Sequence, residues 1–186
     1  HAQDGINIYS NPLAEAISIE VPNKSRSPVS MRTVMQAEEY QNAKPNSLMF
    51  TMGMSIEGKP VCGDIVSMKH ILMAGATGSG KSVMMNSMLI SLLYKYSPED
   101  LRLILIDPKK IEFGIYEGIP HLMIREVITE EKKVVAALAW AVNEMERRYG
   151  LFEKKVRQGI NVREIAEYNE HLEEGEEKLP KIVIVI

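Results

Sequence analysis

The chain has 186 residues, 45% of them hydrophobic and 25% charged, and these fractions are typical of a folded protein with a buried core rather than of a membrane protein. Its formal net charge of −3 argues against a generally basic surface, although net charge alone does not exclude a local basic lining for nucleic acid. The single cysteine, Cys62, rules out an internal disulfide and favours a cytoplasmic setting.

Residues 1–47 predict little regular structure. Apolar and polar side chains alternate over residues 17–21, and Pro22 and Pro28 then break the pattern, which predicts an edge strand followed by a linker or a truncated companion subdomain. Residues 48–66, LMFTMGMSIEGKPVCGDIV, predict two strands joined by the turn EGKP.

The sequence after residue 69 predicts a buried α/β domain. HILMAG at residues 70–75 and LRLILIDP at 101–108 each predict a short buried strand, and residues 82–97 between them predict a buried helix. Strand, helix and strand in this order imply a parallel pair of strands. The closing residues 180–186, PKIVIVI, predict a third buried strand.

Two helices are predicted before this last strand. Residues 129–156 begin with a capping signal at Thr129 and carry apolar side chains at helical spacing, with a bend allowed at Gly150. Residues 161–178 predict an acidic helix whose glutamates lie on a solvated face. The predicted core-facing stripe of the long helix consists of Val134, Leu138, Ala141, Val142, Met145 and Tyr149.

Residues 75–82, GATGSGKS, carry the strongest chemical signal in the chain. They fit the pattern G-x-x-x-x-G-K-[ST] between a predicted strand and a predicted helix, which is the context in which this pattern binds nucleotide phosphates. The glycines let successive backbone N–H groups point inward at the positive end of the helix dipole. The predicted nucleotide-binding residues are Gly75, Ala76, Thr77, Gly78, Ser79, Gly80, Lys81, Ser82 and Val83.

Within this loop, Lys81 and Ser82 are the candidate catalytic residues. The ammonium group of Lys81 is expected to face the β- and γ-phosphates of ATP, and the hydroxyl of Ser82 is expected to bind Mg²⁺. ATP hydrolysis also requires an acid at the end of an apolar strand. Asp107 ends one such strand, but that strand directly follows the predicted P-loop helix, so Asp107 is favoured as a neighbour of the site over its alternative role as a metal ligand.

Other charged or aromatic residues have a structural explanation beside a functional one. Arg147 and Arg148 either reach a neighbouring subunit's nucleotide or pair with Glu144, and the pairing is favoured because acids lie within one helical turn. His121 is expected to serve packing or a local hydrogen bond, and Trp140 is expected to anchor the core. A solvated helix end is favoured over phosphate contacts for the basic cluster of Lys154, Lys155, Arg157 and Arg163.

Three longer segments together resemble a known family. AGATGSGKSVMMNSML, YSPEDLRLILIDPKKIEFGIYEGIPHL and WAVNEMERRYGLF resemble the motor domain of the FtsK/SpoIIIE family of bacterial DNA translocases, and REIAEYNEHL and PKIVIVI follow in that family's order. The resemblance covers residues 48–186 and implies a RecA-like P-loop NTPase, with a mostly parallel sheet flanked by helices and a small N-terminal β-containing segment.

The resemblance also implies a function. Family motors assemble as hexameric rings around double-stranded DNA, and they hydrolyse ATP with Mg²⁺ to move it during chromosome segregation at cell division or sporulation. A membrane anchor holds the cytoplasmic motor at the division septum, and a winged-helix domain reads DNA sequence; this chain contains neither. Because the family's last strand runs into an Asp-Glu pair, the ATPase domain at residues 48–186 is expected to be incomplete at its C-terminus.

Two alternatives stay open at this point. FtsK-like ATPases also serve conjugative DNA transfer and protein secretion. Their P-loop chemistry is the same as in the motors of chromosome segregation. The absence of the Asp-Glu pair also allows a nucleotide-binding module without turnover.

Overall fold

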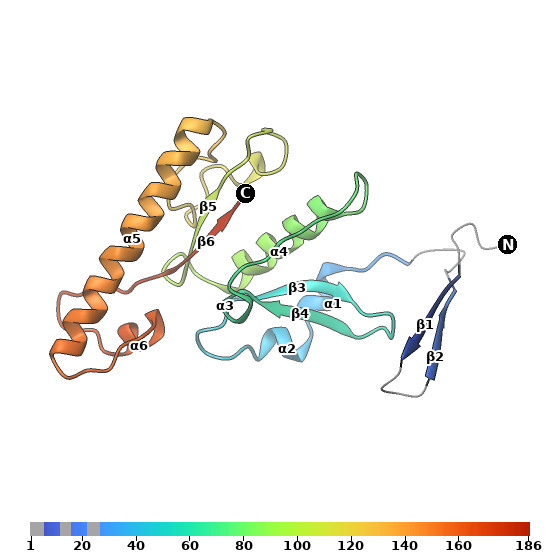
Figure 1. The fold of residues 1–186 in the computed structure, drawn as a ribbon, viewed down its shortest axis with the longest axis horizontal. Helices are drawn as coiled ribbons and strands as arrows, with labels where there is room; N and C mark the ends of the chain where they lie inside the picture. The colour runs from blue at the N-terminus through green and yellow to red at the C-terminus, as the bar shows by residue number, and fades with distance from the viewer. Residues whose placement is uncertain (1–5, 12–15, 22–26) are drawn as a thin grey trace.

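The structure is a computed structural model that describes residues 6–11, 16–21 and 27–186. Strands β1 (Asn7–Asn11) and β2 (Ala16–Glu20) form an antiparallel hairpin that projects from one end of the molecule (Figure 1). The predicted strand at residues 17–21 is confirmed as β2, although it pairs with a strand that the sequence did not predict. Pro22 lies outside the described residues.

The predicted hairpin at residues 48–66 is confirmed. Strands β3 (Met49–Met54) and β4 (Pro60–Asp64) pair antiparallel, and the turn between them places Gly58 at a φ of 77°, in the left-handed region that glycine tolerates. Three short helices surround the hairpin and were not predicted: α1 (Met31–Met35), α2 (Glu38–Gln41) and α3 (Ile65–Met68).

Helix α4 (Lys81–Lys95) packs on β3 and confirms the predicted helix at residues 82–97. Leu89 and Leu92 are fully buried in the core that α4 shares with the hairpin. The hydroxyl of Tyr40 in α2 donates to the Ser91 carbonyl at 2.6 Å, so α2 contacts α4 as well as the hairpin. The predicted domain boundary between residues 47 and 48 stays a prediction.

Strands β5 (Leu101–Leu105) and β6 (Lys181–Val185) pair in parallel, which confirms two predicted strands. Side chains alternate across β5: Leu103 and Leu105 join the core beneath α4, whereas Ile104 belongs to a second cluster beneath the long C-terminal helix. The strand is thus covered by helices on both faces (Figure 1), which explains why its apolar side chains are almost fully buried.

The predicted strand at residues 70–75 is wrong for this structure. Residues 69–80 form neither helix nor strand, and the side chain of Leu72 is 94% exposed. An extended segment becomes a strand only when a neighbour takes up its backbone hydrogen bonds, and no described strand pairs with this one. The expected mostly parallel sheet is accordingly reduced to one parallel pair and two antiparallel hairpins among the described residues.

Helix α5 (Glu131–Arg157) confirms the predicted long helix, with one correction. Its N-cap is Glu130 rather than Thr129, and the helix continues without a break through Gly150, where the bend stays a prediction. The predicted acidic helix is much shorter than expected, because α6 spans only Ile165–Glu170 and the following residues form turns and irregular chain. No helix among the described residues is both long and apolar enough to cross a membrane.

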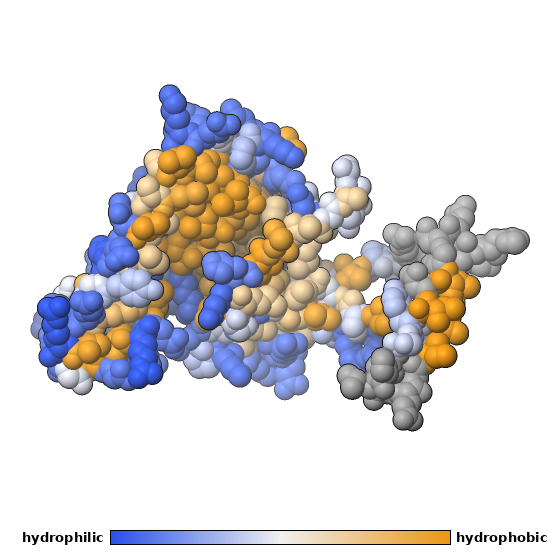
Figure 2. Space-filling model, viewed as in Figure 1, coloured by the Kyte–Doolittle hydropathy of each residue, from blue (hydrophilic) through white to orange (hydrophobic). Residues whose placement is uncertain are grey.

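The predicted core-facing stripe of α5 is only partly buried. Val142 and Tyr149 are more than half exposed, and Leu138 and Met145 are 40% and 45% exposed, because the two-stranded sheet is too narrow to cover a 27-residue helix. Figure 2 shows a broad apolar surface beside this helix and the C-terminal strand, and a second apolar surface on the β1–β2 hairpin. The predicted burial of β6 is also incomplete, since Ile184 is 37% exposed.

Candidate nucleotide-binding site

The loop at residues 75–80 has the backbone that its glycines predict. Gly78 and Gly80 adopt φ angles of 81° and 95°, which residues with a side chain rarely adopt. A Cβ atom at Gly75 would overlap the Ser79 hydroxyl, so a side chain at this position would force Ser79 to move. The left-handed backbone of Gly78 and Gly80 and the close approach of Ser79 to Gly75 therefore shape this loop.

The loop leads directly into α4. Gly80 is the N-cap and Lys81 the first helical residue, so the N–H groups of the first turn lack intrahelical carbonyl partners and face the loop. Lys81 is exposed and lines two pockets of about 460 and 480 Å³ on either side of residues 71–73. Residues 75–83 thus form the loop before α4 and the start of this helix, and their role in binding a nucleotide stays a prediction.

Ser82 makes a contact that the sequence did not predict. Its hydroxyl donates to Glu112 Oε1 at 2.7 Å, although the two residues are 30 positions apart. One turn further along α4, Asn86 Nδ2 donates to the Ser82 carbonyl at 2.9 Å, and Asn86 Oδ1 accepts from the Tyr116 hydroxyl at 2.7 Å. The segment after β5 is therefore attached to the first two turns of α4.

Asp107 anchors this segment from within. Its carboxylate is 4% exposed and accepts the backbone N–H groups of Glu112 and Phe113 at 2.8 and 3.1 Å. Burial alone would raise the pKa of the Asp107 carboxyl, but these and neighbouring N–H groups lower it below its usual value. Because the Asp107 carboxylate holds the segment that follows β5, Asp107 is interpreted as a neighbour of the site. A role of Asp107 as a metal ligand stays a prediction.

Among the described residues, no group of three or more His, Cys, Asp or Glu side chains is arranged to hold a metal ion. The role of Ser82 as a ligand for Mg²⁺ stays a prediction.

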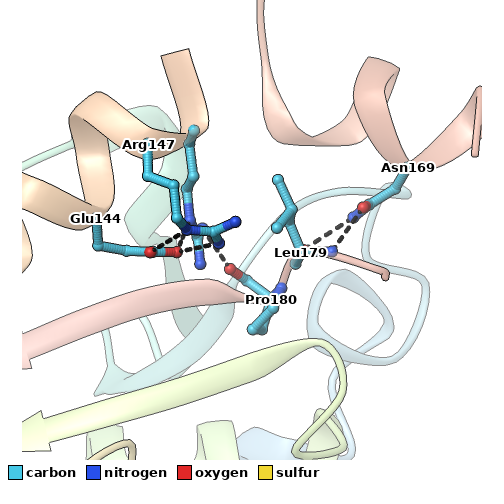
Figure 3. Close-up of polar contacts among 6 residues, drawn as sticks. Glu144, Arg147, Asn169, Leu179 and Pro180 are labelled. Atoms are coloured by element: carbon cyan, nitrogen blue, oxygen red, sulfur yellow. Dashed lines mark hydrogen bonds and ion pairs between the residues drawn. The ribbon is translucent and has the colours of Figure 1, made fainter. Parts of the chain in front are cut away.

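The arginine pair has a structural role at the start of β6. Arg148 is 8% exposed and donates to Glu144 Oε1 at 2.6 Å and to the Pro180 carbonyl at 2.7 Å. Arg147 also pairs with Glu144, at 2.7 Å, and Asn169 exchanges two hydrogen bonds with the Leu179 backbone (Figure 3). The predicted pairing with Glu144 is confirmed.

The basic cluster near the end of α5 is not uniformly solvated. Lys155 is fully buried and pairs with Glu176 at 2.6 Å, so the predicted solvated helix end is wrong for this residue. His121 places Nε2 2.8 Å from the Tyr96 carbonyl, in the local contact that was expected. Trp140 packs against the second core cluster, as expected. Burial raises the pKa of the Cys62 thiol above its ordinary value.

Comparison with known sequences finds relatives that belong to one family. The FtsK/SpoIIIE family profile matches residues 30–186. Proteins named DNA translocase FtsK are 52% identical in Clostridium tetani, 48% in Clostridium acetobutylicum and 45% in Agrobacterium fabrum. The alignments cover 94%, 100% and 90% of this chain but 23%, 24% and 18% of the relatives. The chain therefore spans about a quarter or less of the length of these relatives.

Comparison with solved structures gives two similar folds. The pCW3 conjugation coupling protein TcpA, in its monomer form with ATPgS, matches with a TM-score of 0.58 over 96% of this chain and 46% of its own. The cytoplasmic domain of the Thermomonospora curvata type VII secretion ATPase EccC matches with a TM-score of 0.56 over 84% of this chain and 19% of its own. Both are 23% identical in sequence, so the likeness is one of fold alone.

Proposed function

The chain belongs to the FtsK/SpoIIIE family, and we propose on this basis that it is part of an ATP-driven motor that moves double-stranded DNA. The observation that carries the proposal is the loop at residues 75–82, which joins left-handed glycines, Lys81 and Ser82 at the N-terminus of α4. Relatives of about 50% identity that are named DNA translocases support the choice of DNA as the substrate.

In this proposal each part of the loop has one task. The backbone N–H groups of the loop and of the first turn of α4 bind phosphate oxygens, and the Lys81 ammonium neutralises charge on the β- and γ-phosphates. The Ser82 hydroxyl is a ligand for Mg²⁺. ATP supplies the transferable phosphoryl group when it is bound, and residues 48–186 form the RecA-like ATPase unit.

The proposed assembly is a hexameric ring around duplex DNA, acting in chromosome segregation at cell division or sporulation with its ATPase in the cytoplasm. The exposed apolar surfaces of α5 and β6 support an assembly, because surfaces of this kind are usually covered by protein.

Two alternatives keep specific support. The folds of a conjugation coupling protein and of a secretion ATPase resemble this one, so a role in conjugative DNA transfer or protein secretion uses the same site. A nucleotide-binding module without turnover also uses the loop. Stimulation of ATP hydrolysis by duplex DNA in the full-length protein favours the DNA motor, whereas ATP hydrolysis indifferent to DNA favours secretion and no hydrolysis favours the module.

The P-loop assignment is tested by Lys81→Ala. Removing the ammonium group should weaken binding of ATP or stabilisation of its transition state by about 2–4 kcal/mol, because a charged contact to phosphate is lost. Calorimetric titration with ATP measures the change in affinity, and the ATPase rate of the full-length protein measures the change in turnover. Lys132→Ala, which removes an exposed lysine of α5, is the control. Unchanged affinity and rate in Lys81→Ala would contradict the assignment.

A further inference from the structure

Glu112 is the acidic side chain that the fold brings to the P-loop, and nothing in the proposed function yet uses it. Its carboxylate accepts the Ser82 hydroxyl at 2.7 Å and is partly buried. A hydroxyl group has one proton to donate and two lone pairs that accept hydrogen bonds or bind metal. Because Glu112 accepts the hydrogen bond that the Ser82 hydroxyl donates, the lone pairs of Ser82 Oγ are left for another partner.

The position of Glu112 is fixed on both sides. The buried Asp107 carboxylate holds the Glu112 backbone N–H at 2.8 Å, and four residues later the Tyr116 hydroxyl bonds to Asn86 on α4 at 2.7 Å. Phe113, between these two contacts, is 1% exposed in the main core. The approach of Glu112 to Ser82 is thus built into the fold and does not depend on one flexible side chain.

We propose that Glu112 is a positioning residue for the Mg²⁺ ion of the bound nucleotide, acting through Ser82. Its carboxylate accepts a hydrogen bond from the Ser82 hydroxyl. This bond fixes the rotation of the hydroxyl and orients an oxygen lone pair toward the metal. Groups that hold a metal ligand in this way typically change metal affinity by about 10–100-fold when they are removed. The inference rests on the proposed function, since it takes Ser82 as the metal ligand.

The test separates nucleotide binding from its dependence on Mg²⁺. A fluorescent, non-hydrolysable ATP analogue is titrated into the chain in EDTA and at several Mg²⁺ concentrations. We expect Glu112→Ala to leave affinity in EDTA within about twofold of wild type and to reduce the gain from Mg²⁺ about tenfold. Glu112→Gln keeps an oxygen acceptor without the charge and should reduce the gain about threefold, because a neutral acceptor is weaker.

Controls tie the effect to Ser82. Glu99→Ala removes an exposed acid elsewhere and should keep the full gain from Mg²⁺. In a Ser82→Ala background, Glu112→Ala should produce no further loss, because Glu112 acts through the missing hydroxyl. Thermal unfolding checks that each variant is folded, and if Glu112→Ala does not fold, Glu112→Gln decides the question.

The outcomes distinguish the inference from its premise. A full gain from Mg²⁺ in Glu112→Ala and Glu112→Gln, or equal losses with and without Mg²⁺, overturns the positioning role and leaves the P-loop assignment intact. If the wild-type chain gains nothing from Mg²⁺ and Lys81→Ala binds the analogue as tightly as wild type, the proposed function itself has failed.

Discussion

Gly80 shows how one residue couples the conformation of the loop to the start of the helix. Its φ of 95° lies in the left-handed region, and it is also the N-cap of α4, directly before Lys81. A Cβ atom at Gly80 would meet no atom within 4 Å. Any penalty for adding a side chain here therefore comes from the backbone conformation and not from crowding.

Gly80→Ala should destabilise the protein by about 1–2 kcal/mol and weaken ATP binding, because alanine disfavours the left-handed conformation. Gly150→Ala is a matched control: its Cβ would also meet no atom within 4 Å, but Gly150 lies inside α5. That substitution should stabilise the protein by about 0.5–1 kcal/mol, because alanine favours helix. Thermal unfolding measures both changes, and equal changes in the two variants would contradict the argument.

At the scale of elements, the attachment of β6 depends on α5 and α6. Arg148 on α5 holds the Pro180 carbonyl, and Asn169 on α6 holds the Leu179 backbone, so the chain is fixed on two sides just before the strand begins (Figure 3). Glu144 holds Arg148 in turn, and its side chain is only 10% exposed. The ionised form of Glu144 is therefore part of what positions β6.

The pH dependence of stability should report this ionised form. Hydrogen bonds from Arg147 and then Arg148 lower the pKa of Glu144 to about 2, from an ordinary value of 4.5. The folded state keeps this carboxylate charged where the unfolded chain would protonate it, so the stabilisation is complete above about pH 5 and is lost as the pH falls toward 2. The loss should reach about 2–3 kcal/mol.

Urea unfolding of wild type and Glu144→Gln across this pH range isolates the contribution, because the other carboxyl groups titrate in both proteins. The wild type should lose more stability than the variant as the pH falls. Parallel stability curves would show that Glu144 is not held as a carboxylate in the folded state.

At the scale of the whole molecule, the apolar side chains left exposed on α5 lie in a regular pattern. Val135, Leu138 and Val142 begin a stripe that Met145 and Tyr149 continue, with alternating spacings of three and four residues. This spacing places them on one helix face, which two strands cannot cover. The surface supports the proposal that this chain works within a larger ring, where contacts to DNA are made by the assembly.

A motor that moves along DNA must release every sequence that it passes. We therefore expect the full-length protein, assembled with an ATP analogue, to bind unrelated duplexes with similar affinity through their phosphates, and we expect that affinity to fall about tenfold or more between 50 and 200 mM salt. Fluorescence anisotropy at constant Mg²⁺ measures both properties. Binding that is insensitive to salt would contradict a phosphate-based contact and with it the proposed DNA motor.

The local features of this protein could be predicted from its residues alone. The loop glycines, the helix after them, the β3–β4 hairpin and the strands β5 and β6 all follow from short-range patterns, because φ preferences, apolar runs and turn residues act within a few positions. The pairing of Glu144 with its neighbouring arginines was also predictable, since these residues lie within one turn of a helix.

The contacts between distant segments depend on how the whole chain packs. Residues 70–75 carry the pattern of a strand, but a strand also requires a neighbour to accept its hydrogen bonds, and no described strand pairs with them. The burial of Lys155, the exposed stripe of α5 and the contact between Ser82 and Glu112 depend likewise on partners far away in the sequence. Periodicity shows which residues share a face of an element, whereas long-range packing decides what that face contacts.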